Sequence, residues 1–151
     1  MTDAYASIAT NLERVKERIR NACAASGRDA SAVTLVAVSK KHPAEAVRAA
    51  YAAGQRVFGE NYVQELLEKA EALSDLSDIE WHLIGHLQRN KAKDVVAMSA
   101  VVETVDSERL LLALSERARA MGRLGRERLR NLRSYDVIGR ELAQAYRHLL
   151  S

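Results

Sequence analysis

One lysine, Lys40, follows a short apolar run at residues 33–38 that is rich in β-branched side chains, with only Ser39 between them. Such a run is typical of a buried parallel strand, so Lys40 is expected at a strand's end, partly removed from water. Desolvation raises the fraction of neutral amine, which is the form that attacks an aldehyde to give an imine. Position alone leaves a second interpretation equally open, in which Lys40 begins a solvated loop, as Lys41 does.

Polar residues also follow three later apolar runs. These are residues 56–58 followed by Gly59-Glu60-Asn61, residues 80–84 followed by Gly85-His86-Leu87-Gln88, and residues 101–105 followed by Asp106. The carboxyl ends of parallel strands carry the functional groups in α/β folds, so the four ends predict a polar rim. Two roles are open for Glu60: an acid or base, or a carboxylate paired with a lysine of the rim, and we favour the pairing.

His82 and His86 are four residues apart, as metal ligands on a helix are. However, Leu83 stands where the H-E-x-x-H zinc motif has its glutamate. On a strand, His82 points away from the side taken by Trp81. We therefore predict a packing or site histidine and no metal site. The sequence also lacks the glycine-rich motifs of dinucleotide and nucleoside-triphosphate binding and the hydrolase nucleophile elbow.

Helical patterns alternate with these runs, which predicts an α/β fold of parallel βαβ units with right-handed crossovers. We expect a partial (β/α) TIM-type barrel of four parallel strands over residues 1–122, followed by a basic helical tail over residues 123–151. The expected helix boundaries are a first helix ending at Gly27, a second between Pro43 and Gly54, a third over 62–73, a fourth over 90–98, and a fifth capped by Ser107.

The 151 residues suggest one domain. Residues 1–122 carry a net charge of −1 and residues 123–151 a net charge of +4. We interpret the tail as a solvated arginine-rich face and not as a nucleic-acid-binding segment. No apolar run approaches the roughly 18–20 residues that span a bilayer, the start lacks a secretory pattern, and Cys23 is the one cysteine. These features favour a cytoplasmic protein without membrane contact.

Three of the runs together resemble the pyridoxal phosphate homeostasis proteins, single-domain relatives of the alanine racemase N-terminal barrel. They are Leu35-Val36-Ala37-Val38-Ser39-Lys40, Phe58-Gly59-Glu60-Asn61-Tyr62-Val63-Gln64-Glu65, and Trp81-His82-Leu83-Ile84-Gly85-His86-Leu87-Gln88-Arg89-Asn90-Lys91. The resemblance implies a non-catalytic cytoplasmic protein that binds pyridoxal 5′-phosphate and balances vitamin B6 and amino- and keto-acid pools. Lys40 falls on the family's Schiff-base lysine, and Asn61 and His82 fall near the cofactor. The predicted binding residues are thus Lys40, Asn61, His82 and Gly85.

The resemblance covers about residues 8–120, and the family's later phosphate-binding turns do not occur in this sequence. Two alternatives follow. One is a truncated remnant with weak or no cofactor binding, whose half-barrels dimerise. The other is a fragment of a fold-type-III racemase-like enzyme, which needs a further domain to supply a second acid–base residue. An open four-stranded sheet has unpaired edges, so self-association is also predicted.

Overall fold

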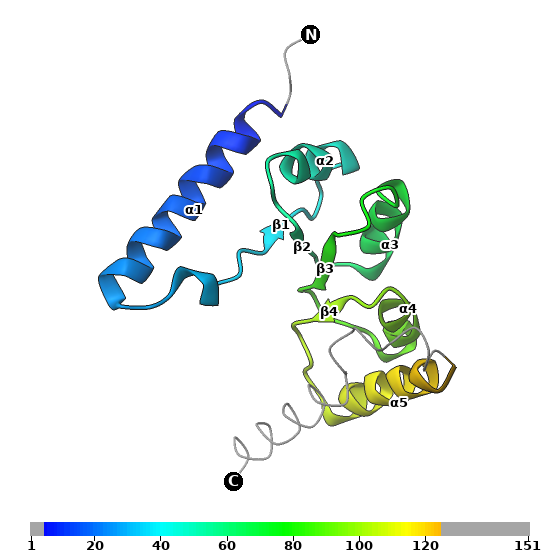
Figure 1. Cartoon of the computed structure of the whole chain (residues 1–151). Coiled ribbons are helices and arrows are strands. Elements are labelled where there is room, and N and C mark those ends of the chain that lie inside the picture. Colours follow the sequence, from blue (N-terminus) through cyan, green and yellow to red (C-terminus); the bar gives the residue numbers. More distant parts are fainter. Residues whose placement is uncertain (1–4, 125–151) are drawn as a thin grey trace.

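The sheet consists of four parallel strands that lie side by side in chain order (Figure 1). The structure is a computed structural model that describes residues 5–124. Its strands are β1 (Ala37–Val38), β2 (Val57–Glu60), β3 (Glu80–Leu83) and β4 (Val101–Val102). All three strand pairings are parallel, and their register aligns Val38, Gly59, His82 and Val101 in one row across the sheet. The predicted α/β fold with four parallel strands is therefore confirmed.

A helix follows each strand and covers the outer side of the arc that the strands form (Figure 1). The helices are α1 (Ser7–Ser26), before the sheet, and then α2 (Ala44–Ala52), α3 (Val63–Ala72), α4 (Ala92–Ala97) and α5 (Glu108–Leu124), with short 3-10 turns at Ala30–Ala32 and Arg89–Lys91. Two predicted helix boundaries are confirmed in detail. Gly27 ends α1 in the left-handed region at φ 66°. The Ser107 hydroxyl accepts a hydrogen bond from the Leu110 N–H at 3.3 Å at the start of α5.

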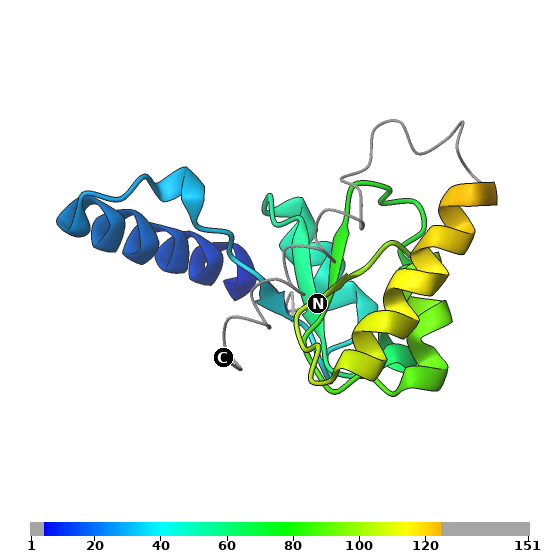
Figure 2. The same ribbon diagram turned by 90° about the horizontal axis from the view of Figure 1, so that it is seen from below.

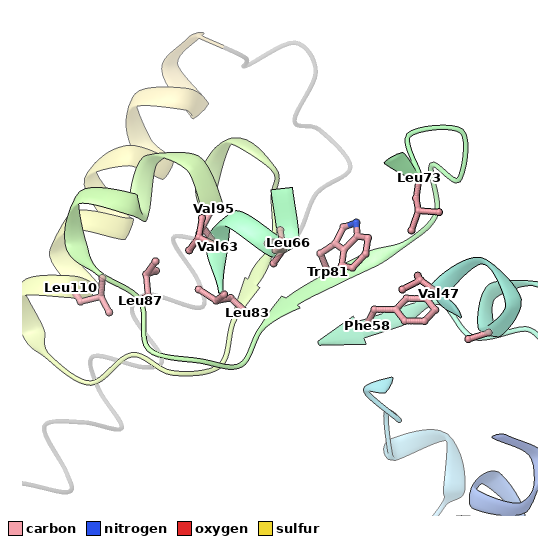
Figure 3. Packing of buried hydrophobic residues seen from close by; sticks show 12 residues of the cluster. Val47, Phe58, Val63, Leu66, Leu73, Trp81, Leu83, Leu87, Val95 and Leu110 are labelled. Atoms are coloured by element: carbon pink, nitrogen blue, oxygen red, sulfur yellow. The ribbon is translucent and has the colours of Figure 1, made fainter. Parts of the chain in front are cut away.

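The hydrophobic core lies between the strands and these outer helices (Figure 3). The strands contribute Phe58 and Leu83, and the helices contribute Val47, Leu66 and Val95, all of which are at most 1% exposed. Burying an aliphatic or aromatic side chain of this size stabilises the fold by about 1.5–3 kcal/mol. The core is thus the main force that fixes each helix against the sheet.

Side chains along each strand alternate between the core and an inner face that points away from the helices. Phe58 and Leu83 belong to the core, so Gly59 and His82 belong to the inner face. A Cβ atom placed on Gly59 would lie 3.0 Å from Val36 Cγ1 and 3.2 Å from Ile84 Cδ1, which puts those two side chains on the same face. The inner face is therefore the concave side of the half-barrel.

Two of the strands are shorter than the apolar runs that predicted them. Residues 33–36 and 103–105 lie outside β1 and β4. The Leu35 carbonyl accepts its hydrogen bond from the Gln55 side chain at 2.7 Å, which replaces a ladder bond. Just after β4, the Glu103 N–H still donates to the Leu83 carbonyl at 3.0 Å, but the hydroxyl of the next residue, Thr104, donates to the Gly85 carbonyl. Side-chain hydrogen bonds thus end the ladders earlier than hydrophobicity indicates.

The first turns of α1 pack near α2, while the rest of the helix projects away from the other helices (Figure 2). Ile8 and Leu12 contact the core cluster, Val15 is 39% exposed, and Cys23 is the buried residue of this helix. None of the helices described has the length and apolar character needed to cross a membrane. The predicted basic tail, residues 123–151, lies outside the described residues, apart from the end of α5.

We expect Leu66→Ala to lower the free energy of unfolding by about 2–5 kcal/mol, because it opens a cavity at a fully buried helix position. Leu112→Ala on α5 is the matched control, since Leu112 is 54% exposed and its truncation should cost less than about 1 kcal/mol. Urea denaturation followed by circular dichroism measures both changes. Equal losses in the two variants would contradict the described core.

Candidate functional site

Lys40 lies in the turn after β1, and its side chain is exposed because the strand ends at Val38. The expected partial removal of Lys40 from water was therefore wrong, and the second interpretation, a solvated lysine, describes its side chain. Its neighbour Ser39 is 7% exposed and bonds to groups on the helix side of the sheet. Lys40 stands two residues after Val38, which is the register partner of Gly59 on the inner face. Its amine makes no hydrogen bond or ion pair with another residue of the segment 5–124. The structure thus presents a free primary amine at the carboxyl end of the first strand.

Asn61 and Gly85 meet at the same rim, at the ends of β2 and β3. Lys40 and Asn61 each stand two residues beyond a member of the Val38–Gly59 register pair. A Cβ atom on Gly85 would lie 2.2 Å from the Asn61 carbonyl oxygen. Only glycine allows this approach of the two backbones.

His82 lies one layer deeper than the other predicted site residues. It pairs with Gly59 in register, two residues before Asn61, and its side chain is only 8% exposed. Its Nδ1 is 2.6 Å from Glu103 Oε1 and its Nε2 is 3.2 Å from Glu80 Oε1. Carboxylates at both ring nitrogens fix the orientation of the imidazole. The confirmed part of the prediction is that His82 and Trp81 point to opposite sides of β3.

The four predicted residues therefore lie in or just after β1, β2 and β3, and the structure brings Asn61 and Gly85 into direct approach. Lys40, Asn61 and Gly85 form the rim, and His82 lies below it. Their role in binding a cofactor stays a prediction. His86 is an exposed residue of the loop beyond Gly85, where its Nδ1 lies 2.9 Å from Asp106 Oδ2.

Glu60 points the other way, into the helix side, where it is fully buried. Its Oε1 accepts hydrogen bonds from the Ser39 hydroxyl and from Lys69 Nζ, each at 2.6 Å. The favoured interpretation of Glu60 as a paired carboxylate is confirmed, but the expected partner was wrong. The lysine comes from α3 beneath the sheet and not from the rim, because Glu60 shares the outward orientation of Phe58.

Glu65 completes this buried charged cluster. It accepts a hydrogen bond from Lys69 Nζ at 2.8 Å, and this bond holds the pKa of the Glu65 carboxyl below its usual value of 4.5. The Lys41 backbone N–H, 2.6 Å from the same oxygen, lowers that pKa further, while partial burial opposes both effects. The low pKa keeps Glu65 ionised beside the ammonium.

Sequence reasoning missed Lys69, although a signal was present. Val63, Leu66 and Leu73 define the buried side of α3, and Lys69 falls on that same side. A lysine within an apolar stripe, four residues after a glutamate, indicates a buried ion pair. The role of Glu80 and Glu103 beside His82 was also missed. For Glu80 the signal is its two-residue spacing from His82 on one strand.

A separate open hollow lies between the Arg89–Lys91 turn and α5. Its lining residues are Gln88, Arg89, Asn90, Ala113, Glu116 and Arg117. None of the four predicted binding residues lines it. No cluster of three or more potential metal-ligating side chains is found within residues 5–124.

Residues 7–129 match the family model of the alanine racemase N-terminal domain. A pyridoxal phosphate homeostasis protein of Pseudomonas aeruginosa is 48% identical over 110 residues, which cover 73% of this chain and 47% of that protein. The protein of the same name from Homo sapiens is 50% identical over 106 residues, covering 66% of this chain and 38% of the human protein. The chain thus spans half or less of the length of these relatives.

Solved structures show the same partial correspondence. PipY of Synechococcus elongatus, solved with pyridoxal phosphate bound, is 44% identical with a TM-score of 0.58, over 69% of this chain and 49% of PipY. A protein of Bifidobacterium adolescentis is 37% identical with a TM-score of 0.72, over 81% of this chain and 54% of that protein. The four-stranded sheet and its helices therefore correspond to about half of each solved chain.

We expect Gly85→Ala to destabilise the protein by about 1–3 kcal/mol, because the new methyl group must push apart two backbones. Gly59→Ala is the matched control. Its Cβ meets only the side-chain ends of Val36 and Ile84, which can shift, so its loss should be smaller. Urea denaturation measures both free energies of unfolding. A smaller loss for Gly85→Ala than for Gly59→Ala would refute the close approach at Asn61.

Proposed function

The chain belongs to the alanine racemase N-terminal domain family, and from this premise we propose that it binds pyridoxal 5′-phosphate through a Schiff base on Lys40. The observation that carries the proposal is the exposed Lys40 amine, which follows the end of β1 and has no partner among residues 5–124. The neutral form of a primary amine is the nucleophile that an aldehyde needs. Relatives named for pyridoxal phosphate homeostasis, and PipY solved with that cofactor bound, support this choice of ligand.

We propose that three further residues line the site with Lys40. Asn61 would offer an amide donor and acceptor to the cofactor, and the absence of a side chain at Gly85 would keep the rim open next to Asn61. His82, oriented by Glu80 and Glu103, would contact the cofactor from the deeper layer of the inner face. The cofactor itself, when bound, supplies the aldehyde for the covalent link and an electron-withdrawing ring.

We propose a non-catalytic role in the balance of vitamin B6 and of amino- and keto-acid pools in the cytoplasm. The relatives are named for homeostasis and not for a reaction. A racemase-like activity is the alternative, in which Lys40 would also act as a base. Exchange of the α-deuterium of deuterated alanine in ordinary water, in the presence of the cofactor, would reveal that activity, and we expect none.

We expect pyridoxal 5′-phosphate to give an imine absorbance band with the 151-residue chain, and Lys40→Met to weaken binding at least about tenfold, which corresponds to about 1.4 kcal/mol. Lys41→Met is the matched control. It removes the same charge from the neighbouring residue and keeps the backbone N–H that is bound to Glu65. Titration read by absorbance, then borohydride reduction and peptide mapping, locates the modified lysine.

Equal affinity of the original chain and Lys40→Met would remove Lys40 from the site. We also expect weaker binding than in a full-length relative. Barrels of this type hold phosphate with backbone donors after the late strands, and this chain corresponds to about half of such a barrel. Affinity equal to that of a full-length relative would contradict this expectation.

We further propose that two copies associate through the outer edges of β1 and β4. The four parallel strands within residues 5–124 are half of the eight that close a barrel of this type, and the chain spans 47% of one relative. A two-fold axis along the barrel would place β4 of each copy beside β1 of the other, which removes both open edges.

Val38→Pro tests this association. The Ser39 N–H points toward β2, where it donates to the Gly59 carbonyl at 3.0 Å, so alternation turns the Val38 N–H to the outer edge. Proline removes that N–H and should convert a dimer of the 151-residue chain to a monomer. Val38→Ala, which keeps the N–H, is the control. Sedimentation velocity that shows the original chain as a monomer would refute the proposal.

A further inference from the structure

The buried charged cluster holds the backbone on both sides of Lys40. On one side, Lys69 Nζ donates to the Ser39 carbonyl at 2.6 Å. On the other side, the Lys41 N–H donates to Glu65 Oε1 at 2.6 Å. Lys69 and Glu65 are themselves joined at 2.8 Å. Side chains of one helix, α3, therefore form hydrogen bonds with both peptide groups that flank Lys40.

The Lys69 ammonium is fully engaged in this arrangement. Its three hydrogen-bond acceptors are the Ser39 carbonyl, Glu60 and Glu65, which match its three donors. Lys69 is 6% exposed and Glu60 is 0% exposed. Charge-assisted bonds in such a place are short and strong, and water does not compete with them. The cluster is thus a rigid support for the turn above it.

The turn requires support because its backbone is strained. Lys41 has φ 62°, in the left-handed region that non-glycine residues seldom adopt. Such conformations persist only where the surroundings hold them. Glu65 binds the N–H of this residue, and the His42 N–H closes the turn on the Ser39 carbonyl at 3.0 Å. Lys69 also binds that same carbonyl.

We infer that Lys69, acting with Glu60 and Glu65 from the helix side of the sheet, is a positioning residue that aims the Lys40 amine at the cofactor. This inference rests on the proposed function of Lys40. Ser39 and Glu60 face the helices, so the cluster is separated from the inner face by the sheet and does not touch the cofactor. It acts on Lys40 through the backbone alone.

The test compares three variants of the 151-residue chain. Glu65→Ala removes the acceptor for the Lys41 N–H at a position that is 23% exposed, so the buried Glu60–Lys69 pair remains. Glu65→Gln keeps an acceptor oxygen and serves as the conservative rescue. Glu68→Ala is the matched control, because Glu68 lies on the exposed side of α3, makes no bond to the cluster and accepts a hydrogen bond from Gln64. A double variant, Glu60→Gln with Lys69→Met, removes both buried charges together.

Two readouts separate positioning from a merely structural role. Amide hydrogen exchange at Lys41, followed by NMR, reports the turn, and titration with pyridoxal 5′-phosphate reports the imine. In Glu65→Ala we expect exchange at Lys41 at least about tenfold faster, because a bound amide becomes free. We expect imine affinity about tenfold to a hundredfold weaker, as for a misplaced reacting group. The double variant should lose affinity in the same way, while Glu65→Gln should recover most of it and Glu68→Ala should match the original chain.

The possible failures are distinguishable. Faster exchange at Lys41 with unchanged affinity would show that the cluster only stabilises the turn, which overturns the inference and leaves the proposed function standing. An unchanged rate of amide exchange at Lys41 in Glu65→Ala would show that Glu65 does not hold the turn, and this result would also overturn the inference. Absence of the imine band in the original chain would overturn the proposed function, and the inference with it.

Discussion

The contact between the Glu60 carboxylate and the Lys69 ammonium is the constraint on which the rest of this half-barrel depends. Removing two such charges from water costs several kcal/mol for each ion unless further hydrogen bonds compensate. The Ser39 hydroxyl supplies such a bond to Glu60 Oε1, and the Ser39 carbonyl and Glu65 supply them to Lys69, while Glu60 Oε2 has no hydrogen-bond partner among residues 5–124. Meeting all of them fixes the rotation of α3 over β2 and ties the end of β1 to the same point.

Much of the fold could be predicted from the sequence because its determinants are local. Apolar runs that alternate with helical stripes require parallel strands with crossover helices, and Gly27 and Ser107 mark helix ends through their own backbone or side-chain chemistry. The strand lengths could not be predicted. An apolar run such as residues 33–38 reports burial, whereas a strand also requires partners, and the Leu35 carbonyl is bound by the Gln55 side chain instead.

Some residues of the candidate site could likewise be predicted from local sequence, and others could not. Lys40 was accessible to sequence reasoning because a lysine after an apolar strand needs only its immediate neighbours to be noticed. The partner of Glu60 could not be predicted in this way, because Lys69 pairs with Glu60 only once α3 has packed on the sheet. The carboxylates beside His82 come from two strands, and the Glu103 contact depends on the pairing of β3 with β4. Contacts between elements require a register that no single stretch of sequence specifies.

Two consecutive residues connect the stabilising and the proposed functional parts of the site. Ser39 and Lys40 both follow the end of β1, but their surroundings differ. The first is buried and fully hydrogen-bonded, and the second is exposed with an amine that no residue of the described segment engages. The backbone at Lys40 is therefore fixed by hydrogen bonds of Ser39 and Lys41, while the Lys40 amine itself makes none within residues 5–124. Because β1, β2 and α3 all lie within this chain, the support for the proposed covalent link is self-contained. The phosphate of the proposed cofactor, in contrast, must find its donors beyond these four strands.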